Sequence, residues 1–269
     1  MRKKKTWPVG LLLIAGVMLC ALLAPVLAPY SPTEQLLAEG LEGPSLTHLF
    51  GQDRLGRDLL SRTLYGAQIS MWVATVAISI SLGIGLLIGA VAGHLGGWMD
   101  EILMRLVDIV QAFPGILLAI AFAAILGPSI TNVVIALSII GWTGYARLTR
   151  GQILVVREME FVAAARALGG RDIRVILRHL LPNILGPIVV EASFGFATVI
   201  IAEASLSFLG LGTQPPTPSW GAMLNEARQY LLVAPHLTLF PGLAIVVTVM
   251  GFNFLGDSLR DRWDPRGGK

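Results

Sequence analysis

The sequence predicts an all-α membrane protein with six transmembrane helices and both termini on the cytoplasmic side. Of the 269 residues, 54% are hydrophobic and only 14% are charged, whereas ordinary soluble chains carry about 25% charged residues. The mean hydropathy is +0.71. A soluble fold of this composition would have too little polar surface to cover itself, but a surface that faces lipid should be apolar. The lengths of the apolar runs and the placement of Lys and Arg then give the spans and their orientation.

Six apolar runs approach the length of about 20 residues that a helix needs to cross the hydrocarbon core. They are 9–28, 69–92, 102–126, 130–146, 184–204 and 237–256. Helices are expected because every backbone polar group within a bilayer must be bonded inside its own span. We divide the chain into residues 1–67, which hold the first span and an outer segment, and residues 68–269, which form the main transmembrane domain with a cytoplasmic loop at 147–183.

The first run could instead be a cleaved signal peptide. A basic start precedes it, and Val26-Leu27-Ala28 resembles a cleavage site. Pro29 would follow the cut, however, and this favours a span that is retained.

Lys and Arg are concentrated on one side of the predicted spans. With the N-terminus inside, sixteen of the twenty fall on the cytoplasmic side, and the outer side receives four, Arg54, Arg57, Arg62 and Arg228. This bias follows the positive-inside rule. Both termini on one side require an even number of spans, which six satisfies. A basic start beside an apolar run also indicates membrane topology rather than nucleic-acid binding.

The second predicted span carries a small residue at every fourth position. The row is Ala77, Ser81, Gly85, Gly89 and Gly93. Such a row lets two helix backbones approach closely. The simpler interpretation is packing within this chain, and a subunit interface is the alternative.

The cytoplasmic loop holds two short helical patterns between Glu158 and Asn183. The first is alanine-rich and ends at Gly169 and Gly170, since glycine commonly follows the last residue of a helix. The second is amphipathic, with Ile173, Ile176, Leu177 and Leu180 on one stripe, and Pro182 predicts a break before the next span. Such a segment can lie on the anionic inner leaflet or dock into a partner's groove.

This loop resembles the cytoplasmic EAA loop of binding-protein-dependent ABC importer permeases. The matching residues are Ala164, Ala165, Gly169, Leu181 and Pro182. Ala163 stands where the family has Glu, and Glu160 lies one turn upstream. The resemblance implies that the loop docks onto an ATPase, with Ala163, Ala164, Ala165, Arg166, Ala167, Leu168, Gly169 and Arg171 as the coupling residues.

Three further stretches resemble the dipeptide, oligopeptide and nickel branch of that family. They are FGQDRLGRDLLSRTLYGAQIS from residue 50, SLSFLGLGTQPPTPSWGAMLNEARQYLL from residue 205, and NFLGDSLRDRWDPR near the C-terminus. Together with the loop they appear in the order of the C-type subunit of a two-permease pair. The resemblance therefore implies the type I ABC importer permease fold.

The same resemblance implies a set of partners and a function. The partners would be a second homologous permease, two cytosolic ABC ATPases and an external binding protein, assembled in the lipid of the cell's inner membrane. The expected cargo is di- or oligopeptides, with nickel or a chelated metal as the alternative; a glutathione-like cargo also fits the branch.

ATP and Mg²⁺ would be bound by the partner ATPases. A P-loop needs Gly-Lys-Ser/Thr at the start of a helix, and the one Gly-Lys pair here is Gly268-Lys269 at the end of the chain. We expect no cofactor and no metal cluster in the chain, because Cys20 is the one cysteine and the four histidines are scattered. An intramembrane enzyme is a remote alternative, since the spans hold no paired nucleophile and base.

Charged residues inside the spans are candidates for the translocation path, because a charge at the bilayer centre costs about 2.5–3.5 kcal/mol on insertion scales. They are Glu191, about two turns into its span, and Glu203, which we expect to be exposed near the outer interface.

The outer segment is predicted to form a short polar helix at the surface, held by mutual ion pairs. Its residues are Asp53, Gly56, Arg57 and Asp58, with Arg62. The loop at 213–230 is expected to serve as an external gate or binding-protein footprint, or as a structural connection.

Overall fold

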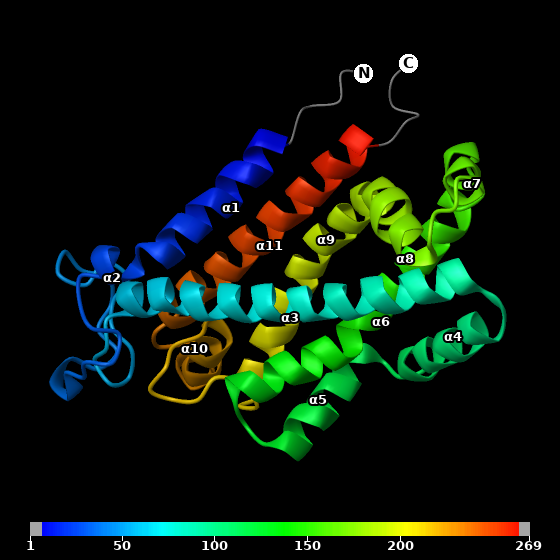
Figure 1. The fold of residues 1–269 in the computed structure, drawn as a ribbon. Coiled ribbons are helices and arrows are strands. Elements are labelled where there is room, and N and C mark those ends of the chain that lie inside the picture. Colours follow the sequence, from blue (N-terminus) through cyan, green and yellow to red (C-terminus); the bar gives the residue numbers. More distant parts are fainter. Residues whose placement is uncertain (1–6, 264–269) are drawn as a thin grey trace.

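A computed structural model describes residues 7–263, and within that range the chain forms helices and no named strand (Figure 1). The helices are α1 (Trp7–Leu22), α2 (Ala24–Leu27), α3 (Leu59–Leu95), α4 (Gly97–Gln111), α5 (Gly115–Leu126), α6 (Ile130–Val156), α7 (Glu160–Ala167), α8 (Asp172–Val175), α9 (Leu181–Phe208), α10 (Trp220–Ala227) and α11 (His236–Trp263). Short 3₁₀ turns occupy Leu37–Glu39 and Arg228–Tyr230, and a π-helical turn occupies Ile176–Leu180. The basic start at Arg2 to Lys5, the end of the C-terminal motif at Asp264 to Arg266, and Gly268-Lys269 lie outside the described residues.

Within the described residues, three helical segments are long and apolar enough to cross a membrane. They are α3, the continuous segment Asp172–Phe208, and α11. The pair α4 and α5 would make a fourth, but its axes are bent by 82°. The chain is therefore a multi-pass membrane protein.

The single helical span expected over residues 102–126 is divided into two helices in the structure. α4 ends at Gln111 and α5 begins at Gly115, with Pro114 between them. Proline disfavours helical geometry in the residue before it and offers no N–H of its own, so the helix breaks there although the apolar run continues.

The helices α3 and α6 are packed along their length through the predicted row of small residues. A Cβ added at Gly89 would collide with the Ala146 carbonyl and meet Thr149 Cβ at 2.6 Å. At Gly93 it would meet Ile153 Cβ at 3.0 Å, and at Gly85 it would meet the Ala146 nitrogen at 2.9 Å. The glycines of the row therefore serve packing within this chain, as the simpler interpretation expected.

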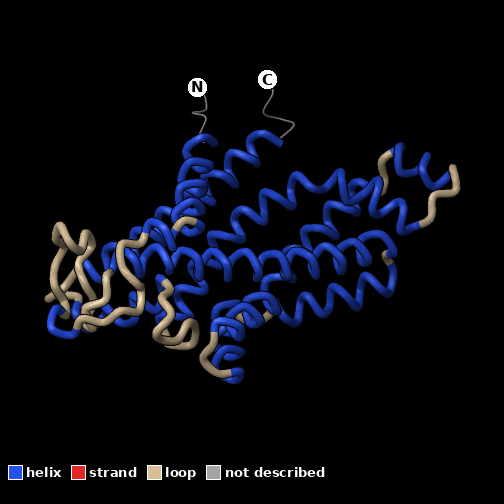
Figure 2. Tube along the Cα trace, turned by 60° about the vertical axis from the view of Figure 1, so that its left-hand side comes forward, coloured by secondary structure: helices blue, strands red, loops and turns tan. Residues whose placement is uncertain are grey.

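The first and last helices pack against each other through glycines on both sides. A Cβ at Gly10 in α1 would meet the Leu255 nitrogen at 2.7 Å, and one at Gly251 in α11 would meet Ile14 Cγ1 at 3.1 Å. The start of α1 and the end of α11 lie at the same end of the pair (Figures 1 and 2). Hence both ends of the described chain face the same side.

The break expected at Pro182 is wrong. The helical segment is continuous from Asp172 to Phe208, and Pro182 lies in the first turn of α9. Pro182 has no N–H to donate to the preceding turn, yet the helix runs through it, as it also runs through Pro187. The irregularity lies one turn earlier, in the π-helical turn Ile176–Leu180.

Candidate functional site

The predicted coupling residues lie on a hairpin formed by α7 and α8, residues 158–175, which projects at one end of the molecule. The loops of the outer segment gather at the opposite end (Figure 2). Along α7 the side chains of Ala163, Ala164, Arg166 and Ala167 are exposed, while Ala165 is half-buried. Leu168 is 89% exposed at the helix end. The exposed surface of α7 thus combines small alanine side chains with Phe161 and Arg166, and an exposed leucine stands at its end.

A tight turn ends α7 at the predicted glycines. Gly169 has a φ of +82°, its N–H donates to the Arg166 carbonyl, and the N–H of Gly170 donates to the Ala165 carbonyl at 3.0 Å. This is the Schellman arrangement, in which glycine takes the left-handed position just after the helix. It turns the chain sharply into α8, whose first residues are Asp172 and Ile173, with exposed Arg171 before them.

The base of the hairpin is packed into the body of the protein. Val162 of α7 and Val175 of α8 are fully buried, in one apolar cluster with Ile153, Val156 and Leu180. The stripe expected on the second piece is split, since Ile173 and Leu177 are 69% and 61% exposed while Leu180 is buried. The π-helical turn Ile176–Leu180 shifts the face presented by the residues that follow its start, whereas Ile173 lies before it.

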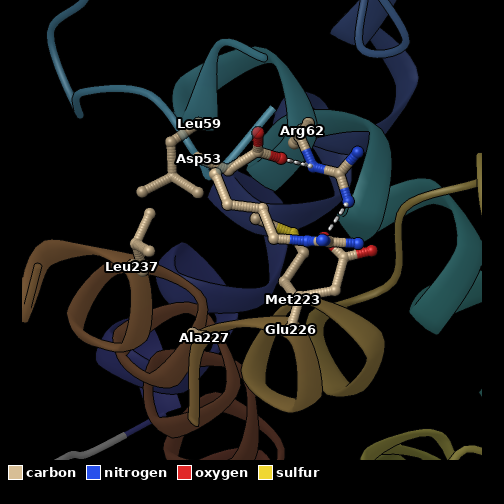
Figure 3. A pocket seen from close by; sticks show the side chains of 8 residues that line it. Asp53, Leu59, Arg62, Met223, Glu226, Ala227 and Leu237 are labelled. Atoms are coloured by element: carbon tan, nitrogen blue, oxygen red, sulfur yellow. Dashed lines mark hydrogen bonds and ion pairs between the residues drawn. The ribbon is translucent and has the colours of Figure 1, made fainter. Parts of the chain in front are cut away.

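A buried ion-pair network joins the outer segment to the end of α10. Arg57 Nε donates to Asp53 Oδ2 at 2.6 Å, and its NH2 group donates to Glu226 Oε2 at 2.5 Å. Arg62 reaches the same two carboxylates at 3.4 and 3.2 Å (Figure 3). The side chains of Arg57 and Arg62 are only 2% and 1% exposed.

The expected ion pairs in the outer segment are therefore present, but the expected short surface helix is wrong. Residues 53–58 form an irregular loop that ends at the start of α3. Asp58 caps that helix by accepting the Ser61 N–H at 2.8 Å and bonds His48 Nδ1 at 2.9 Å. Gly56 has a φ of +70° and lies against the Leu36 carbonyl, where no side chain fits. Arg54 is exposed, whereas Asp53, Arg57 and Asp58 are buried, each with a bonded polar or charged partner.

Glu203 is buried, so the exposure expected for it is wrong. Its carboxylate accepts the Ser207 hydroxyl at 2.7 Å and the Ser70 hydroxyl at 3.1 Å, and the residue is 1% exposed. Hydrogen bonds from hydroxyls offset the cost of burying a polar group. Glu191, in contrast, is exposed on α9.

Several residues of these sites carried no recognisable signal in the sequence. Glu226 lies 164 residues from Arg62, so no local pattern pairs them. His94 and Asp172, whose side chains bond at 2.8 Å, are 78 residues apart. Among residues 7–263, no three His, Cys, Asp or Glu side chains stand close enough to hold a metal ion.

Comparison with known proteins places this architecture in a family. Residues 85–268 match the family described as "Binding-protein-dependent transport system inner membrane component", and residues 1–44 match the "N-terminal TM domain of oligopeptide transport permease C". The chain belongs to the binding-protein-dependent transport permeases. It is thus a permease subunit of an ABC importer, as its motifs indicated.

Individual relatives of this permease extend over nearly its whole length. The chain is 46% identical over 266 residues to the dipeptide transport system permease protein DppC of Alkalihalophilus pseudofirmus, covering 99% of this chain and 88% of the relative. It is 49% identical over 256 residues to the glutathione transport system permease protein GsiD of Escherichia coli O6:K15:H31, covering 95% and 84%. These relatives are transport subunits and not enzymes, and neither is this chain an enzyme.

The fold is similar to that of a solved transporter. A chain of the MetNI methionine ABC transporter in an inward-facing form superposes with a TM-score of 0.58 at 20% identity, covering 74% of this permease and 93% of that chain. At this identity the likeness concerns the fold alone, and it supports the type I importer permease fold. As an ABC importer permease, the chain works with partner ATPase and permease subunits.

Proposed function

We propose that this permease imports di- or oligopeptides as one half of a permease heterodimer in the cell's inner membrane. The observation that carries the proposal is the exposed alanine surface of α7, closed by the turn at Gly169, on a chain 46% identical to a dipeptide permease. In this proposal two cytosolic ATPases bind ATP and Mg²⁺ and move the hairpin, and an external binding protein delivers the peptide. Transport then proceeds by alternating access.

The proposed topology has six crossings and cytoplasmic termini. The crossings are α1, α3, the bent pair α4–α5, α6, the segment Asp172–Phe208 and α11. The shared side of the two ends supports an even number of crossings, and the excess of Lys and Arg on that side supports a cytoplasmic location. The α7–α8 hairpin would then face the cytosol.

The residues proposed to contact the ATPase are Ala163, Ala164, Ala165, Arg166, Ala167, Leu168, Gly169 and Arg171. Small side chains allow a partner surface to approach the α7 backbone closely. Glu191 is proposed for the translocation path, because an exposed carboxylate within a span is too costly to face lipid. For Glu203 to take part in the translocation path, the hydroxyls of Ser70 and Ser207 would have to release its carboxylate.

The test is a bulky substitution on the exposed face of α7. Ala164→Trp should abolish ATP-driven uptake of a radiolabelled dipeptide, because the indole blocks the close approach, while membrane insertion stays normal. Glu101→Ala on exposed α4 is the matched control. Normal uptake by a stably inserted Ala164→Trp variant would refute the docking role.

The identity of the cargo is tested by competition. Glutathione is the second candidate, because the chain is 49% identical to a glutathione permease, and nickel or a chelated metal is the third. Unlabelled dipeptide should displace labelled dipeptide, while nickel should not. Uptake that only nickel inhibits would overturn peptide import.

A further inference from the structure

Two residues, one on each side of the segment 158–171, bond the α7–α8 hairpin to the C-terminal end of α3, and we call them its roots. The first root is Arg157, directly after α6, whose NH1 group donates to the Gly93 carbonyl at 2.8 Å. The second root is Asp172, the first residue of α8, whose Oδ1 lies 2.8 Å from His94 Nε2. Gly93 and His94 are neighbours in the last turn of α3. One point on α3 therefore holds both ends of residues 158–171.

The surroundings of these bonds indicate that they hold the hairpin in a fixed position relative to α3. The His94 side chain is 3% exposed, and its other ring nitrogen, Nδ1, has no hydrogen-bond partner among the described residues. Since Asp172 accepts, Nε2 carries the proton that is donated. The Gly93 carbonyl is one of the last four of α3, which lack an intrahelical partner, and an arginine is a favourable partner there.

Apolar packing at the same place makes the hairpin and α3 one unit. Val162 and Val175 of the hairpin share a buried cluster with Ala90 of α3 and Ile153 of α6. Gly93 lets Ile153 approach, because a Cβ there would stand 3.0 Å from the Ile153 side chain. A force applied to α7 therefore reaches the end of α3 through both polar bonds and packing.

The far end of α3 lies in the buried ion-pair network of Asp53, Arg57, Arg62 and Glu226, here called the outer network. α3 is a single helix of 37 residues, about 55 Å long at 1.5 Å per residue. Its N-terminal turn holds Arg62, which pairs with Asp53 and with Glu226 near the end of α10. One unbroken helix thus connects the hairpin with the outer segment.

We propose that His94, Asp172 and Arg157 are positioning residues that fasten the coupling hairpin to α3. Movement imposed on α7 is then transmitted through α3 to the outer network instead of being absorbed by bending at the hairpin base. This inference rests on the proposed docking of α7 to an ATPase. It assigns a transmitting role to residues outside the docking surface.

The experiment uses the complete importer with both permeases, both ATPases and the binding protein in proteoliposomes. Peptide uptake and ATP hydrolysis are measured in the same vesicles, and the readout is peptide imported per ATP. Asp172→Ala is the main variant, because the Asp172 side chain is 74% exposed and its removal leaves no cavity. We expect this ratio to fall by about threefold to thirtyfold, with ATP hydrolysis retained.

Further variants separate positioning from general damage. His94→Gln keeps an N–H donor near the position of Nε2 and should retain most of the ratio, whereas His94→Leu should lower it as Asp172→Ala does. The double variant His94→Leu/Asp172→Ala should be no worse than either single change, since both remove the same bond. Arg157→Met should lower the ratio independently, and Glu101→Ala should leave it unchanged.

An unchanged ratio in assembled Asp172→Ala complexes would overturn the inference. So would equal losses in His94→Gln and His94→Leu. Failure of the proposed function itself would look different, because the unmodified importer would then show no ATP-driven peptide uptake.

Discussion

At the scale of single residues, the outer network depends on a balance of charge in a place with little water. Arg57 and Arg62 share the carboxylates of Asp53 and Glu226, and both arginines are almost fully buried. The geometry leaves neither guanidinium able to reach bulk solvent. Each carboxylate therefore contributes more to the stability of the protein than a carboxylate in a solvent-exposed ion pair would.

Replacing one of these carboxylates should destabilise the protein strongly. Glu226→Gln leaves two buried arginines opposite one carboxylate, and breaking a buried pair in this way costs about 3 kcal/mol or more. The check is the apparent unfolding midpoint in detergent at one fixed heating rate. Arg54→Ala, at an exposed neighbouring position, should change the free energy of unfolding by less than about 0.5 kcal/mol. Equal midpoints for the Glu226→Gln variant and the unmodified protein would contradict this reading.

Gly169 is the residue on which the shape of the hairpin depends. At a φ of +82°, side chains other than glycine cost about 1–2 kcal/mol, and asparagine tolerates the conformation best. Gly169→Asn should therefore keep most peptide uptake, whereas β-branched Gly169→Val should lose it. Neither variant should introduce a clash, because a Cβ at Gly169 meets nothing within 4 Å. Similar uptake by the two variants would therefore show that the backbone conformation is unimportant.

At the scale of elements, the contact of α3 with α6 decides how closely the body of the protein packs. Gly89→Leu inserts a side chain where the Ala146 carbonyl and Thr149 already stand, and overpacking of this kind costs about 1–3 kcal/mol. Gly83→Leu on the same helix is the control, because a Cβ there meets nothing within 4 Å. The unfolding midpoint of the isolated subunit should fall for Gly89→Leu alone. A similar fall for both variants would indicate a loss of helix flexibility rather than a clash.

At the scale of the whole molecule, the two polar ends of the structure should lie on opposite sides of the membrane. Leu46 in the outer segment is 98% exposed and Leu168 on the hairpin is 89% exposed. In a Cys20→Ser background, a membrane-impermeant maleimide should label Leu46→Cys in intact cells. It should label Leu168→Cys only after the cells are permeabilised. The reverse pattern would invert the proposed orientation.

The sequence predicted the parts of this protein that depend on composition and on local backbone chemistry. Apolar runs predicted the positions of α3, α9 and α11, because burial in lipid requires apolar side chains wherever the span lies. The alanine-rich stretch and Gly169 predicted α7 and its end, because helix propensity and a left-handed φ are local properties. The small-residue row from Ala77 to Gly93 predicted close packing, because its spacing along the chain places small side chains on one face of the helix.

Only the tertiary structure decided which distant residues meet. Nothing local to Arg62 identifies Glu226, and nothing local to His94 identifies Asp172, because both pairs form where separate helices end side by side. The same applies to Glu203, whose burial depends on Ser70 of a different helix. The helix breaks at Pro114, between α4 and α5, but runs through Pro182 and Pro187, so a proline in the sequence does not by itself tell whether the helix ends there. A sequence specifies which elements form, while pairing between them depends on geometry that a one-dimensional pattern does not contain.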